Sequence, residues 1–139
     1  MRRLRGVPEG QRDTVFAAGG GYDPAHPRET ELAPDVAFVR ADRLPDRASP
    51  NYPKAWPIAP DLAVEVASPN QYRPGLGAKA RLYLSFGTRL VWVGWPRWQQ
   101  VDVWRPGDAR PSATLSAGDI LDGLDVVPDF TYPVAKLFA

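Results

Sequence analysis

The chain has 139 residues, about the size of one domain, and its 44% hydrophobic and 24% charged residues are typical of a globular protein. The 17 Lys and Arg residues against 16 Asp and Glu residues give a net charge of +1, which excludes a global positive field for nucleic acid and leaves only local binding. The absence of cysteine excludes disulfides, zinc–thiolate sites and thiol nucleophiles, and the single histidine, His26, offers little to a catalytic triad. Carboxylates and lysines remain as the candidate chemistry.

The N-terminus and the apolar runs indicate a protein without membrane contact. The basic residues after Met1 resemble the start of a signal peptide, but a polar segment stands at residues 7–13, where an apolar stretch would be required. No later run is long and apolar enough to span a bilayer. We therefore expect a single cytoplasmic domain over residues 1–139, with a polar N-terminal segment at residues 1–13.

The first half of the chain contains two short predicted strands and a proline-rich connection. Apolar runs predict strands at residues 14–18 and 36–39, and Pro34 and Asp35 stand directly before the second one. Five prolines at residues 42–60 fix too many φ angles and remove too many N–H donors for a helix or a central strand. This stretch is therefore predicted to be irregular and largely extended.

The clearest predicted strand covers residues 62–67. Leu62, Val64 and Val66 alternate with residues of the opposite face, where the acids Asp61 and Glu65 stand beside two alanines. An ionised carboxylate in a buried strand is costly unless it is paired, hydrogen-bonded or bound to metal. Glu65 therefore needs a partner.

The pattern after this strand predicts a crossover followed by antiparallel strands. A helix at residues 76–86 leads to a buried strand at residues 90–95, and such a strand–helix–strand unit is a right-handed crossover between parallel strands. The later predicted elements are a hairpin strand, two short edge strands and a final helical turn, at residues 100–104, 113–115, near Val126 and at residues 133–138. We expect an α/β fold with a mixed sheet and a β-rich C-terminal half.

Carboxylates from two neighbouring strands form a candidate metal site. Asp61 and Glu65 share a face but are about 13 Å apart along the strand, too far to bind one ion together. Asp35 is the better second ligand, provided that the strand after it pairs beside the strand of Glu65. Such a hard-oxygen site suits Mg²⁺ or Mn²⁺.

Lys79 is the candidate cation, because its place in the helix lets the ammonium reach back across the sheet toward Glu65 and stabilise charge on a phosphate. Each residue also has a structural interpretation. Asp35 and Asp61 are suited to caps or turns, and Glu65 can form a buried ion pair with Lys79 or Arg81. The spacing alone does not decide between these interpretations.

The tryptophans form a further group. Side chains of this kind stack on single-stranded nucleic acid, but at strand and hairpin positions they more often belong to the core. We assign to packing Trp92, Trp95, Trp98 and Trp104.

Several motifs in order resemble the Uma family of restriction-endonuclease-like proteins, a branch of the PD-(D/E)XK nuclease superfamily. The matching segments are residues 33–39, 59–69, 79–93, 101–106, 118–122 and 128–138. The resemblance implies a mixed sheet flanked by helices, with Asp35 as the first acid, Glu65 as the second and Lys79 in place of the motif lysine, because Ala67 occupies its usual position. The implied activity is Mg²⁺-dependent hydrolysis of DNA phosphodiester bonds.

The family pattern includes N-terminal elements that have no counterpart in this chain. Relatives carry an N-terminal helix, a first hairpin and a further helix, often with an early glutamate of the site, before the segment that matches residue 14. We therefore expect a restriction-endonuclease-like domain that lacks its first helices and hairpin, and a homo-oligomer, most simply a dimer, because the uncovered sheet exposes apolar surface. The alternatives to a nuclease are a catalytically inactive remnant that acts as an oligomerising or nucleic-acid-associated module, and a purely structural protein.

Overall fold

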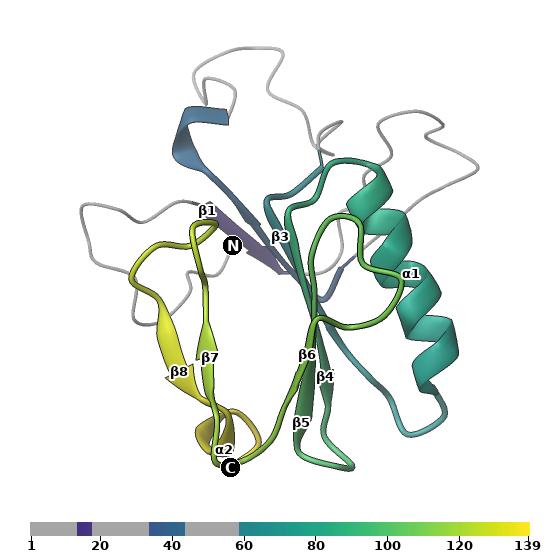
Figure 1. Ribbon diagram of the computed structural model, residues 1–139. Coiled ribbons are helices and arrows are strands. Elements are labelled where there is room, and N and C mark those ends of the chain that lie inside the picture. Colours follow the sequence, from purple (N-terminus) through teal and green to yellow (C-terminus); the bar gives the residue numbers. More distant parts are fainter. Residues whose placement is uncertain (1–13, 18–33, 44–58) are drawn as a thin grey trace.

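The computed structural model describes residues 14–17, 34–43 and 59–139, and these form a mixed α+β fold with one large sheet (Figure 1). The sheet has six strands in the order β1-β2-β3-β4-β5-β6, and β7 and β8 form a separate two-stranded sheet. The strands are β1 (Thr14–Ala17), β2 (Val36–Val39), β3 (Leu62–Val66), β4 (Leu90–Trp95), β5 (Gln100–Trp104), β6 (Ala113–Leu115), β7 (Ile120–Asp122) and β8 (Thr131–Pro133). The helices are the 3₁₀ helix η2 (Ala41–Arg43), α1 (Arg73–Ser85) and α2 (Val134–Leu137).

The centre of the large sheet is the predicted crossover. Strand β3 pairs in parallel with β4, and α1 connects them, whereas every other pairing in the sheet is antiparallel. The predicted pairing of the strand after Asp35 with the strand of Glu65 is also confirmed, with Val36 opposite Val64. The expected mixed sheet with β-rich C-terminal half is therefore the observed architecture.

The two faces of the sheet have separate hydrophobic cores. Helix α1 covers one face, and the β7–β8 hairpin with α2 lies over the other (Figure 1). Leu62 of β3 belongs to the core under the hairpin, whereas Ala63 belongs to the core under α1. The predicted alternation of β3 is therefore correct, and Glu65 lies on the α1 face.

Helix α1 begins earlier than the apolar period predicts and ends where glycine indicates. It starts at Arg73, three residues before the predicted Leu76, and has a proline in its first turn, where the missing N–H removes no helical hydrogen bond. Gly87 follows with a φ of +108°, a conformation that glycine adopts without strain. The extra first turn places Arg73 beside Trp95, Gln100 and Asp102, at the end of the sheet where β4 and β5 meet.

The predicted strand near Val126 is wrong. Val126 and Val127 are 3% and 1% exposed, but they lie in a turn whose N–H groups donate to the Gly123 carbonyl oxygen at 3.1 and 2.9 Å. The Gly123 N–H donates in turn to the Phe130 carbonyl oxygen at 2.9 Å. The turn therefore buries its β-branched side chains without joining a sheet, and the strands form on either side of it.

Part of the expected organisation falls outside the described residues. The polar segment at residues 1–13, the loop with His26 and residues 44–58 of the proline-rich connection are not described. At the start of that connection, Ala41–Arg43 form a 3₁₀ turn and not an extended segment, because the Arg43 N–H donates to the Arg40 carbonyl oxygen at 3.0 Å. No helix among the described residues is long and apolar enough to cross a membrane.

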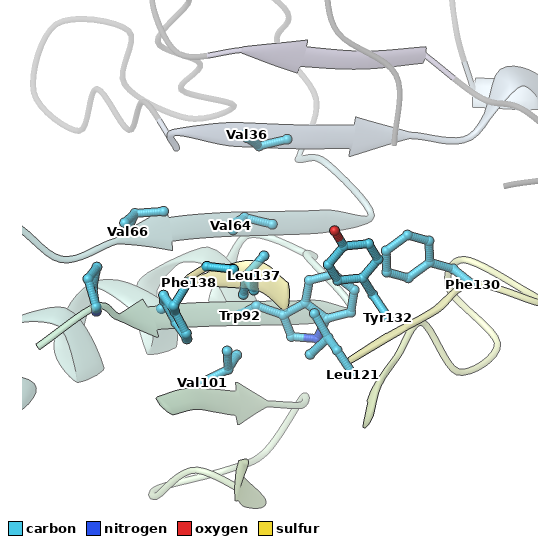
Figure 2. Close-up of a pocket in the computed structure, with 13 residues that line it drawn as sticks. Val36, Val64, Val66, Trp92, Val101, Leu121, Phe130, Tyr132, Leu137 and Phe138 are labelled. Atoms are coloured by element: carbon cyan, nitrogen blue, oxygen red, sulfur yellow. The ribbon is translucent and has the colours of Figure 1, made fainter. Parts of the chain in front are cut away.

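An apolar groove of about 510 Å³ lies on the sheet face away from α1. Figure 2 shows its walls, formed by side chains of β2, β3 and β4 on one side and by Tyr132, Leu137 and Phe138 on the other. Two of its lining residues, Val66 and Leu137, are 48% and 46% exposed. The groove has no carboxylate or lysine side chain in its lining, so it is not the predicted catalytic site.

Candidate active site

Glu65 is a buried acid in the middle of the α1 face. It lies on β3 between β2 and β4, and it is only 5% exposed. Strand alternation places it there, since its neighbours Val64 and Val66 point to the opposite core. A carboxylate in this position requires polar partners, and the helix above it supplies two of them.

Lys79 and Tyr83 both contact one oxygen of Glu65. The Lys79 ammonium lies 3.0 Å from Oε1, and the Tyr83 hydroxyl donates a hydrogen bond to the same oxygen at 2.7 Å. These residues are four apart on α1, so they lie one above the other on the same face of the helix. The expected approach of Lys79 to Glu65 is observed, whereas Arg81 lies over the Trp104 ring, 5.7 Å from its centroid.

Tyr83 is the residue that the sequence reasoning missed as a member of this site. Its side chain is fully buried, and its hydroxyl holds Glu65 in place from the centre of the core. The spacing of four residues between Lys79 and Tyr83 could have indicated it, because a lysine that reaches a buried acid brings the next turn of the helix over the same strand.

Asp35 approaches the site from the neighbouring strand. Because Val36 lies opposite Val64, the antiparallel register places Asp35 beside Glu65. Its Oδ2 accepts a hydrogen bond from the Val66 N–H at 2.6 Å. The structure therefore brings the two predicted acids and Lys79 together at one end of β2.

The chemistry of these donors fits a small divalent cation. Among the described residues, the contacts of Glu65 fall on Oε1 and those of Asp35 on Oδ2, so each acid keeps a second oxygen available. Two carboxylates with solvent access through Asp35 resemble the sparse protein ligand sets that Mg²⁺ accepts while it keeps several waters. No group of three or more His, Cys, Asp or Glu suited to a metal occurs in the described parts of the chain. Asp35 and Glu65 would therefore be the acidic ligands of an ion at this place among those residues.

Asp61 has a structural role at the start of β3, as its distance from Glu65 predicted. It is 1% exposed, accepts the Arg40 N–H at 2.9 Å and pairs with the Arg43 guanidinium at 2.7 Å. Arg43 also donates to the Ala59 carbonyl oxygen at 3.1 Å. Asp61 therefore ties the 3₁₀ turn after β2 to the start of β3, and this contact holds the two acid-bearing strands in register.

The tryptophans divide into two classes. The assignment to packing is correct for three of them, which are at most 4% exposed: Trp92, Trp95 and Trp104. It is wrong for Trp98, which lies in the turn between β4 and β5 and is 45% exposed. This ring is therefore accessible to a ligand.

Comparison with known proteins supports the fold and assigns a family. Residues 1–135 match the family model Uma2, described as "Putative restriction endonuclease". The structure is similar to a crystal structure of "a putative nuclease belonging to DUF820" from Anabaena variabilis, with a TM-score of 0.69 and 21% identity over 89% of this chain. The chain spans 66% of the length of that protein, and no curated protein matches it. Since the family model covers nearly all of its residues, the chain belongs to the Uma2 family of restriction-endonuclease-like proteins.

Proposed function

We propose that this protein is a Mg²⁺-dependent endonuclease that hydrolyses phosphodiester bonds of DNA in the cytoplasm. The observation that carries the proposal is that Lys79 contacts the buried Glu65, while Asp35 lies opposite Glu65 in the strand register and accepts the N–H of the adjacent Val66. An acid from each of two adjacent strands and a lysine ammonium are the groups that phosphodiester hydrolysis uses. Nuclease-like function follows from the family, whereas the metal, the DNA substrate and the site residues are part of the proposal.

The residues have separate roles in the proposed reaction. Asp35 and Glu65 would hold Mg²⁺ or Mn²⁺, which when bound neutralises phosphate charge and lowers the pKa of water. The Lys79 ammonium stabilises the negative charge that builds on the phosphoryl oxygens. Water adds its oxygen to phosphorus and loses a proton as the bond to one ester oxygen breaks, and the leaving oxygen takes up a proton. Tyr83 keeps the Glu65 carboxylate oriented through this change.

The test is metal-dependent nicking of a supercoiled plasmid. The wild-type chain should nick it with Mg²⁺ or Mn²⁺ and not with EDTA. Glu65→Gln, Asp35→Asn and Lys79→Met should each lower the rate by about 10²–10³-fold, the usual effect of removing one charge-stabilising group. Asp125→Asn is the matched control for the acids, because that residue is exposed and pairs with Arg89 at 2.8 Å.

Lys136→Met is the matched control for the lysine, since Lys136 is an exposed lysine of α2. Both control variants should cut at the wild-type rate. Equal rates for all variants would remove the three residues from the mechanism, and no cleavage of any DNA by the wild type would refute the endonuclease proposal.

The alternative function is a catalytically inactive module. The observation that favours it is the same ion pair, because Lys79 and Tyr83 together satisfy Glu65 Oε1 without any ligand. For such a module, calorimetry with Mn²⁺ should detect no binding that depends on Asp35 and Glu65. Site-specific binding that Glu65→Gln abolishes would contradict it.

Self-association is a further part of the proposal. The apolar groove and its exposed residues Val66 and Leu137 support a homodimer formed through this face. Sedimentation at micromolar concentration should show a dimer for the wild type and a monomer for Leu137→Asp. A wild-type protein that stays monomeric and stable under these conditions would show that the groove needs no partner copy.

A further inference from the structure

A cluster of aromatic and cationic side chains lies at the end of the sheet where β4 turns into β5. The rings of Trp95 and Trp98 are 5.4 Å apart at an angle of 47°. The Arg73 guanidinium lies over both rings, 4.8 Å from the centroid of Trp98 and 5.5 Å from that of Trp95. Arg97 approaches Trp98 at 5.8 Å. We name these four residues the tryptophan–arginine platform.

A buried acid fixes the platform from beneath. Asp102 is 4% exposed, and its Oδ2 lies 3.4 Å from Arg73 Nε and accepts the Trp95 indole N–H at 2.9 Å. Its other oxygen accepts the Thr114 hydroxyl at 2.7 Å, and Arg73 also donates to the Gln100 side chain. Asp102 has no role in the proposed hydrolysis. Its contacts hold Arg73 and Trp95 in one arrangement, so fewer side chains must be ordered when a ligand binds and the entropic cost of binding is lower.

The platform lies on the same face of the sheet as Glu65. In the strand register Glu65 is opposite Val93, and Val93 is opposite Asp102, so the two acids are about 10 Å apart across the sheet. Ala67, two residues beyond Glu65, lines a hollow of about 520 Å³ together with Trp95 and Trp98. The strand advances about 7 Å from Glu65 to Ala67.

A second hollow lies beside the lysine of the candidate site and shares one lining residue with the hollow at the platform. It has a volume of about 350 Å³ and is lined by Lys79 and Gln71, and Gln71 also lines the hollow beside Trp98. Tyr72, which is 70% exposed, borders it. One strand of nucleic acid could therefore follow the loop before α1 from Lys79 to Trp98.

We propose that the tryptophan–arginine platform binds an unpaired nucleobase of the DNA strand whose phosphate lies at Glu65 and Lys79. The inference rests on the proposed function and specifies its substrate as DNA with a single-stranded segment. The Trp98 ring remains 45% exposed although Arg73 and Arg97 lie over it, so its exposed part offers a stacking surface and the arginines offer charge for the backbone. Paired bases keep their faces stacked inside the duplex, so the platform distinguishes single strands from duplexes.

The test is the binding of a fluorescein-labelled 12-nucleotide DNA single strand and of the matching duplex, measured by anisotropy in EDTA to prevent cleavage. Trp98→Ala should weaken single-strand binding by about 10-fold, within the range expected for the loss of one stacked base, and should leave duplex binding unchanged. Trp98→Phe keeps a stacking ring and should stay within about threefold of wild type.

The controls separate stacking from folding. Ile120→Ala removes a side chain that is 54% exposed on β7. This strand lies on the sheet face away from the platform, so both affinities should be unchanged. Melting curves for each variant establish that the protein is folded, which the 45% exposure of Trp98 leads us to expect.

The outcomes distinguish this inference from the proposed function. Equal single-strand affinity for wild type and Trp98→Ala, or equal losses for single strand and duplex, would overturn the platform as a base-binding site even if the protein cuts plasmid. A Trp98-dependent preference for single strands in a chain that cuts no DNA would support base binding and refute the endonuclease.

Discussion

The contact between Lys79 and Glu65 allows the structural and catalytic interpretations of the site to be separated by measurement. Lys79→Met removes the ammonium at 3.0 Å and leaves a carboxylate that is 5% exposed with the Tyr83 hydroxyl as its donor. Breaking a fully buried pair costs about 3–5 kcal/mol. Because the Lys79 side chain is 32% exposed, water compensates in part, and we expect a loss of about 1–3 kcal/mol in the free energy of unfolding.

The partner variant Glu65→Gln supplies the rest of a double-mutant cycle. Glutamine has nearly the same shape and still accepts the Tyr83 hydrogen bond, so the variant with both substitutions should recover most of the stability lost in Lys79→Met. Urea denaturation of the four proteins should give a coupling energy of at least about 1 kcal/mol. Additive effects within about 0.5 kcal/mol would show that the pair contributes no stability in solution, contrary to this reasoning.

Plasmid cleavage by the same four proteins completes the experiment. If the pair is catalytic, the double variant should be stable and inactive, because restored packing does not restore the ammonium or the carboxylate. If the pair is only structural, cleavage should follow the folded fraction and return in the double variant. Recovery of cleavage would therefore remove Glu65 and Lys79 from the reaction.

Three further substitutions test other contacts. Tyr83→Phe removes a buried donor to the site carboxylate and should cost about 1–3 kcal/mol in urea denaturation, and an unchanged midpoint would show that the hydroxyl contributes nothing. Asp61→Asn weakens the arginine pair before β3 and should cost about 1–2 kcal/mol without changing cleavage per folded molecule, so a selective loss of cleavage would contradict its structural role. Gly123→Ala places a Cβ 2.3 Å from the Val127 carbonyl oxygen and should lower the melting temperature, whereas Gly75→Ala, with no atom within 4 Å, should not.

The central crossover could be predicted from the sequence because its patterns are strong and local. The alternation along residues 62–66 determines which side chains point to each face of the sheet. The continuous apolar run at residues 90–95 indicates a strand that is buried on both faces. The strand near Val126 could not be distinguished in the same way. Its paired valines suit a strand, but the hydrogen bonds that make it a turn depend on Gly123 and Phe130, which belong to the three-dimensional arrangement of the hairpin.

The candidate site was predictable where its residues lie on regular elements. Asp35, Glu65 and Lys79 follow from strand pairing, strand alternation and a helix above the sheet, and the structure brings them together. Asp102 was missed because its alternation with two valines suggests a strand with one solvated face. Its burial depends on Arg73 and Trp95, which reach it from other elements.

The assignment of Trp98 to the core was the opposite error, because a residue predicted to be buried is exposed. Tryptophan in a hairpin is most often core, and the sequence contains nothing that marks this one as different. Its exposure follows from the turn after β4, in which Gln99 adopts a φ of +51° and leads the chain back into β5. The turn conformation, and not the composition of the segment, leaves the ring at the surface.

The separation of the two acids along the chain has a consequence for how the site is assembled. Lys79 and Glu65 are 14 residues apart in the sequence, whereas Asp35 and its partner Val66 are 31 apart, so the lysine–glutamate contact can form earlier in folding. Asp35 reaches them only when β2 closes a loop of more than 20 residues onto β3, a slower event with a larger entropic cost. The proposed affinity for a divalent cation should therefore appear late in refolding, after the lysine–glutamate pair, so that metal binding would report the pairing of β2 with β3.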